Sequence, residues 1–71
     1  DSNSVAMMGI HMIRDQLDGA MRMHALEVII EEELPGSASR NAALIVAIQT
    51  LQEDGDTEAA ADLMVELVLS N

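Results

Sequence analysis

The prediction of an all-helical fold starts from residues 34–56, LPGSASRNAALIVAIQTLQEDGD. Pro35 ends any helix that precedes it, because its ring cannot continue a helix, and Gly36 accepts a positive φ. Gly55 fits the position just after a helix C-terminus, and Asp56 is a suitable N-cap for a following helix. The two breaks therefore close one helix between them and start another.

Two C-terminal helices follow from these breaks. The first covers about residues 39–54, with Ser37 or Ser39 as its N-cap, and the second covers about residues 57–70. The apolar positions at helical spacing are Leu44, Ile45, Ala47, Ile48 and Leu51 on the first helix, and Ala60, Leu63, Met64, Leu67 and Val68 on the second. No stretch shows the period-two alternation typical of strands, so the predicted fold class is all-α.

Upstream of Pro35, the apolar pattern predicts one long helix over about residues 4–34. Its seam has a 4-3-4 spacing and consists of Ala6, Ile10, Ile13 and Leu17. Beyond Gly19 the apolar positions shift in phase, which either a kink at Gly19 or a second packing partner would explain. We therefore expect a small bundle of three helices, the first one long, with a kink possible at Gly19.

The whole chain, residues 1–71, is predicted to form a single small helical domain. A domain of about 60 residues buries only roughly 60% of its unfolded surface, and this chain has no cysteine for disulfides. Hydrophobic residues make up 49% of the chain, more than a lone core of this size hides. We therefore expect a homodimer, formed through the first helix and the apolar faces of the other two.

The composition excludes several classes of function. Thirteen acidic residues against three arginines give a net charge of −10, and there is no aromatic residue, so direct nucleic-acid binding is not expected. The longest apolar run, Ala42 to Ile48, has seven residues, against about 20 needed to cross a bilayer. These features predict a cytoplasmic protein with no membrane contact, and they suggest no cofactor.

Methionine is concentrated near the N-terminus. Five of the six methionines lie within the first 23 residues. Because methionine is flexible and polarizable, it fills irregular cores and also forms adaptable binding surfaces. We select Met7, Met8 and Met12 as candidate partner-binding residues.

An acidic row is the second candidate surface. Glu58, Asp62 and Glu66 follow one another at i+4 spacing along the last predicted helix. Such a row is either a solvated face or a docking face for a basic protein, since a uniform field attracts and orients an opposite charge. In its strongest form the second interpretation is nucleic-acid mimicry, in which the chain inhibits a DNA- or RNA-binding protein.

Two Met-x-x-His pairs form a possible metal site. Met8 with His11, and Met21 with His24, each share a helix face at i,i+3 spacing. Thioether and imidazole are suitable ligands for Cu(I) or Ag(I). Chance is a strong competing explanation, because the motif needs only two residues in a methionine-rich stretch.

No pattern predicts an enzyme. The chain has no lysine, cysteine or tyrosine for covalent or proton-transfer chemistry, and neither histidine belongs to the Glu-x-x-His motif of di-iron bundles. We therefore predict no catalytic residues and a non-enzymatic regulatory or adaptor protein. It would inhibit or escort another protein, a basic one if the acidic row is the docking face, with nucleic-acid mimicry and Cu(I) or Ag(I) binding as alternatives.

Overall fold

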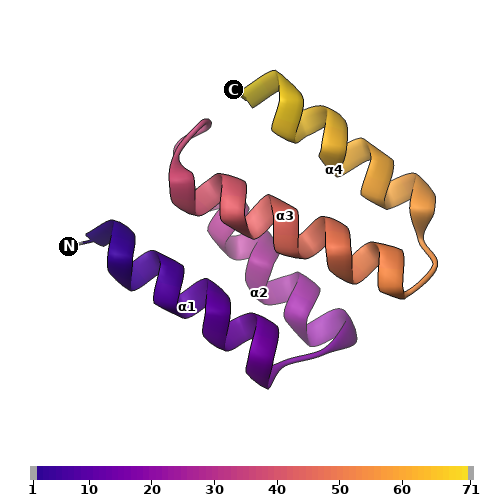
Figure 1. Ribbon diagram of the computed structural model, residues 1–71, viewed down its shortest axis with the longest axis horizontal. Helices are drawn as coiled ribbons and strands as arrows, with labels where there is room; N and C mark the ends of the chain where they lie inside the picture. The colour runs from indigo at the N-terminus through magenta and orange to yellow at the C-terminus, as the bar shows by residue number, and fades with distance from the viewer. Residues whose placement is uncertain (1, 71) are drawn as a thin grey trace.

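The computed structural model describes residues 2–70, and the side chains of residues 4–70. This part of the chain forms four helices: α1 (Ser2–Gln16), α2 (Gly19–Glu32), α3 (Ala38–Glu53) and α4 (Thr57–Ser70). Each helix runs back against the one before it, and Figure 1 shows α1, α3 and α4 side by side with α2 behind. The all-α prediction is confirmed, whereas the expected count of three helices is wrong.

The predicted long first helix is wrong because the chain breaks at Asp18-Gly19. The helix α1 ends at Gln16, Asp18 is extended (φ −138°, ψ 170°), and Gly19 has a positive φ of 51°. A left-handed backbone costs other residues about 1–2 kcal/mol, so glycine permits a reversal here that most residues would resist. The phase shift of the apolar positions beyond Gly19 therefore marks a separate helix and not a bend.

Arg22 closes the turn between α1 and α2. Its Nε donates to the carbonyl oxygen of Leu17 and its Nη2 to that of Arg14, both at 2.9 Å. The last carbonyls of any helix lack partners within the helix, and Arg22 supplies partners at the end of α1. Its Nη1 reaches α3, where it lies 3.3 Å from Thr50 Oγ1 and 3.5 Å from the Glu53 carboxylate.

The predicted boundaries of the two C-terminal helices agree closely with α3 and α4. Ser37 caps α3, its hydroxyl oxygen accepting from the Arg40 backbone N–H at 3.2 Å. Gly55 follows the C-cap of α3 with a φ of +81°. Asp56 caps α4, its Oδ1 accepting from the Ala59 N–H at 3.2 Å. These ends form where the local sequence alone favours them.

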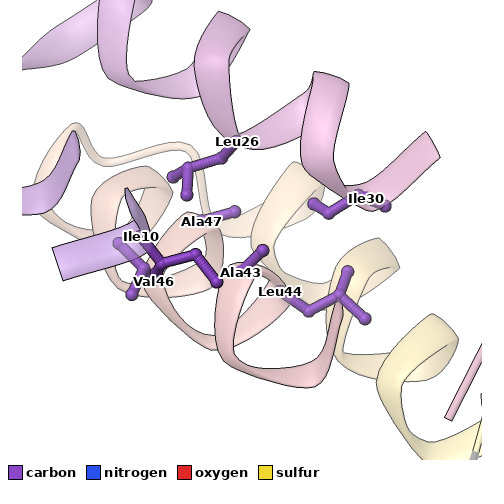
Figure 2. Close-up of a cluster of buried hydrophobic side chains, with 7 residues drawn as sticks. All are labelled: Ile10, Leu26, Ile30, Ala43, Leu44, Val46 and Ala47. Atoms are coloured by element: carbon purple, nitrogen blue, oxygen red, sulfur yellow. The ribbon is translucent and has the colours of Figure 1, made fainter. Parts of the chain in front are cut away.

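The helix α3 is the centre of the fold, because α1, α2 and α4 all pack on it. The core consists of Ile10, Leu26, Ile30, Ala43, Leu44, Val46 and Ala47. In Figure 2, Leu26 and Ile30 of α2 face Ala43 and Ala47 of α3. These alanines let the two helices approach closely, since the distance between packed helices depends on the side chains at the contact.

The arrangement is flat, with extents of 35 × 29 × 14 Å. In the described part of the chain, α4 packs on α3 alone, whereas α1 contacts both α2 and α3. As a result, α2 and α4 both lie on α3, and their backbones do not approach each other closely. Among residues 2–70, no helix is long and apolar enough to cross a membrane.

Candidate protein-binding surface

Arg40 pairs with one member of the predicted acidic row, Glu66. Only 8% exposed, it donates from Nε to the Ile30 carbonyl oxygen and from Nη1 to Ser70 Oγ, both at 3.0 Å. Its Nη2 pairs with the Glu66 carboxylate. Glu66 therefore joins α4 to α3, and only Glu58 and Asp62 of the row stay exposed and unpaired within the described residues.

The other two arginines are also engaged within the chain. Arg14 pairs with Asp15 at 3.2 Å, and Arg22 pairs with Glu53 at 3.5 Å. The chain has three cationic side chains in total and no lysine. Every other carboxylate in the described part of the chain therefore lacks a cationic side chain as partner.

Three of these unpaired carboxylates border a hollow between α2 and α4. We call this hollow, of about 400 Å³, the acidic groove. It is lined by Met23 and Glu27 of α2, Leu51 of α3, Asp56 of the following turn, and Ala59, Asp62 and Leu63 of α4. It lies where α2 and α4 flank α3 without close approach of their backbones.

The floor of the acidic groove is apolar, and its rim is acidic. The floor residues, all half-buried, are Met23, Leu51, Ala59 and Leu63. Glu27 is exposed on the α2 side, Asp62 is exposed on the α4 side, and Asp56 lies at the turn. Asp56 already accepts the capping hydrogen bond from Ala59, so Glu27 and Asp62 are the freer charges.

This arrangement suits the binding of a cation attached to an apolar group. Low-dielectric walls lined by one sign of charge concentrate the electric field and attract the opposite charge. The apolar floor adds stabilisation whenever a ligand covers it, at about 25 cal/mol per Å² of apolar surface removed from water. The groove therefore brings apolar contact and negative charge together at one site.

The predicted methionine surface divides into two faces. Met8 and Met12 are 65% and 61% exposed on one face of α1. Met7 is half-buried and packs against the core. Met8 and Met12 thus remain available to a partner, whereas Met7 serves the packing of α1.

A further apolar surface, the outer stripe, covers the side of α4 that faces away from α3. It consists of Met64, Val65, Val68 and Leu69, which line a shallow hollow of about 240 Å³. Val68 and Leu69 are 71% and 80% exposed. With Leu63 and Leu67 of the same helix packed on the core, α4 is apolar on two sides.

The two Met-x-x-His pairs lie on separate helices. Met8 and His11 are both exposed on α1, and Met21 and His24 are both exposed on α2. Among the described residues, no three histidine, aspartate or glutamate side chains gather as a ligand set for a metal ion. Soft-metal binding by the methionine-histidine pairs stays a prediction.

Of the groove residues, only Asp62 belongs to a site predicted from the sequence. Glu27 stands out in the sequence only as one of several acidic residues, and Leu51 and Leu63 only as apolar positions of a helix face. These residues come together only through the packing of three helices, and the spacing of residues within one helix cannot predict that packing. No protein-family model, curated protein or solved structure matches the chain.

Proposed function

We propose that this chain is a non-enzymatic regulatory or adaptor protein that binds a segment of another protein and so blocks or escorts it. The acidic groove carries this proposal, since half-buried apolar side chains and unpaired carboxylates line one hollow. An apolar centre with a polar rim is the usual anatomy of a protein–protein interface. The sequence left open whether apolar or acidic residues bind the partner, and the groove combines both.

Homodimerisation is the second part of the proposal. The outer stripe and the exposed face of Met8 and Met12 are the surfaces that a dimer would bury. Burying a large aliphatic side chain is worth about 1.5–3 kcal/mol, and Val68 and Leu69 are among the most exposed apolar residues of the described chain. Both surfaces lie outside the acidic groove, so a dimer formed through them leaves the groove free for a partner.

A pair of matched variants tests partner binding. Ala59→Arg places a long cation in the groove, beside its carboxylates, whereas Ala61→Arg puts the same side chain on an exposed position of the same helix outside the groove. Tagged wild-type and variant proteins are incubated with a lysate of the source cells, and the bound proteins are quantified by mass spectrometry. Circular dichroism at 222 nm confirms that both variants keep their helices.

We expect one protein or a small set of proteins to bind wild type and Ala61→Arg and to be lost with Ala59→Arg. The bound partner should regain its free behaviour, such as activity or aggregation, when Ala59→Arg replaces wild type. A folded Ala59→Arg variant that retains the same proteins as wild type would contradict the proposed binding through the groove.

A further inference from the structure

We infer that the ligand of the acidic groove is a cationic amphipathic helix, a segment with one apolar stripe and lysine or arginine on both sides of it. This inference rests on the proposed function and specifies the chemistry of the partner. It draws on three features: the shape left between α2 and α4, the placement of the carboxylates, and the lack of spare cations in this chain.

The shape of the groove favours a helix. Packed helices lie about 8–10 Å apart, so two helices that pack on a third without meeting leave a trough along it. The helices α2 and α4 stand in this relation on α3. Elsewhere in the chain a helix packs on two others at once, since α1 contacts both α2 and α3, which also contact each other. A partner helix would occupy the open trough in a similar way.

The floor specifies the buried side of that helix. Met23, Leu51 and Leu63 come from three different helices and are all half-buried. A ligand that touches all of them must present apolar side chains along one face, as i, i+3, i+4 and i+7 positions of an amphipathic helix do. The flexible Met23 thioether can adapt to the shape of these side chains.

The rim specifies the charge of the flanks. Glu27 stands on the α2 side and Asp62 on the α4 side, with Asp56 at the turn. None of the three has a cationic partner in the described part of the chain. Lysine and arginine can lay their aliphatic stems on apolar surface and keep the charge in water. Cations on both flanks of the bound helix would therefore meet a carboxylate on each side.

A second copy of this chain fits the groove poorly. Its cationic side chains are three arginines, and all three bind acidic groups or carbonyl oxygens within their own chain. The thirteen acidic residues of a second copy would bring like charges to the rim. Charge complementarity thus favours a different, basic protein.

Three synthetic peptides of roughly 18 residues, about five helical turns, serve as fluorescein-labelled probes. The first has a leucine stripe flanked by lysines, the second has glutamine at the lysine positions, and the third has alanine at the leucine positions. Their affinities for the full chain are measured by fluorescence anisotropy at about 50 mM salt, where exposed charges are weakly screened. We expect the first peptide to bind at least about tenfold more tightly than either of the others.

Two variants with the same change of net charge locate the site. Glu27→Gln combined with Asp62→Asn neutralises both sides of the rim, whereas Asp18→Asn combined with Glu32→Gln neutralises exposed acids that do not line the groove. The side chain of Asp18 makes no capping hydrogen bond, so the control leaves α2 intact. We expect the first pair to weaken the lysine–leucine peptide by about 3- to 10-fold and the control pair by less than about 2-fold.

The contrary results do not all overturn the same statement. Equal weakening by the two pairs would mean that the peptide is attracted to the overall charge of the chain, which would overturn the inference. Failure of the lysine–leucine peptide to bind would overturn it as well. Tight binding of the glutamine–leucine peptide, abolished by Ala59→Arg, would refute the cationic ligand but leave the proposed function standing. The proposed function itself is judged separately, by the lysate experiment with Ala59→Arg and Ala61→Arg.

Discussion

Replacing Arg40 by methionine should destabilise the fold more than the same replacement of the exposed Arg14. Arg40 is 8% exposed and joins the end of α2, through Ile30, to the end of α4, through Ser70 and Glu66. Methionine fills much of the same space, so the loss is mainly one of polar contacts. After the substitution, the Ser70 hydroxyl keeps another hydrogen bond and the Glu66 carboxylate is accessible to water, whereas the buried Ile30 carbonyl loses its donor.

The magnitude follows from the surroundings of each partner. The Ile30 carbonyl loses the hydrogen bond from Arg40, which costs about 1–3 kcal/mol for a buried acceptor. The Ser70 hydroxyl still donates to the Glu66 carbonyl oxygen at 2.7 Å. The Glu66 side chain is 43% exposed, so water replaces much of the ion pair and its loss costs only about 0–1 kcal/mol. The sum is about 1–4 kcal/mol.

Thermal unfolding followed by circular dichroism at 222 nm measures this loss. A domain of this size shifts its Tm by about 4–8 °C per kcal/mol, so Arg40→Met should lower the Tm by roughly 4–32 °C. Arg14→Met is the control, because Arg14 forms its ion pair with a sequence neighbour and is 44% exposed; it should cost less than about 0.5 kcal/mol. Equal Tm values for the two variants would refute the role of Arg40 in tying α2 to α4.

Four further variants test the turns, the glycine within α1 and the outer stripe. Gly36→Ala and Gly55→Ala both place a side chain at a φ near +80°, but only at Gly36 would the new Cβ lie 2.9 Å from a neighbour, the Ser70 carbonyl oxygen. Both should lower the free energy of unfolding by about 1 kcal/mol, with about 1 kcal/mol more lost for Gly36→Ala; equal losses in thermal unfolding would contradict this contact. Gly9→Ala lies within α1 with nothing within 4 Å of a new Cβ, so the free energy of unfolding should rise by about 0.5–1 kcal/mol, and a lowered Tm would oppose this expectation. Val68→Glu should convert the proposed dimer to monomer in analytical ultracentrifugation while preserving the helical circular dichroism signal, and a dimer that persists would exclude the outer stripe as its interface.

The sequence predicts the helix ends well where residues beside each other determine them. Pro35, Gly55 and Asp56 act through their own backbone or through a cap one turn away, and the observed ends agree with them. The break at Gly19 is harder to predict from the sequence, because a glycine in an apolar helical pattern is compatible with both a continuous helix and a turn. The turn is stabilised by Arg22, whose bonds reach α1 and α3, so it depends on packing as well as on local sequence.

The candidate site depends on contacts between residues that are distant in the sequence, and it could therefore not be predicted from the sequence. The i+4 spacing correctly places Glu66 in line with Asp62, but it cannot show that Arg40 of another helix neutralises Glu66. Similarly, Glu27 and Asp62 share a groove only because α2 and α4 pack on the same helix. The sequence pattern reveals the residue types of the site, and the packing of helices decides which of them meet.

The most direct test of binding through the acidic groove is an NMR titration of the ¹⁵N-labelled chain with the unlabelled lysine–leucine peptide. We expect the largest chemical-shift changes at the backbone amides of Met23, Leu51 and Leu63, with smaller changes at Val68. Largest changes at Val68 of the outer stripe, or at Met8 and Met12 of α1, would contradict the groove as the binding site.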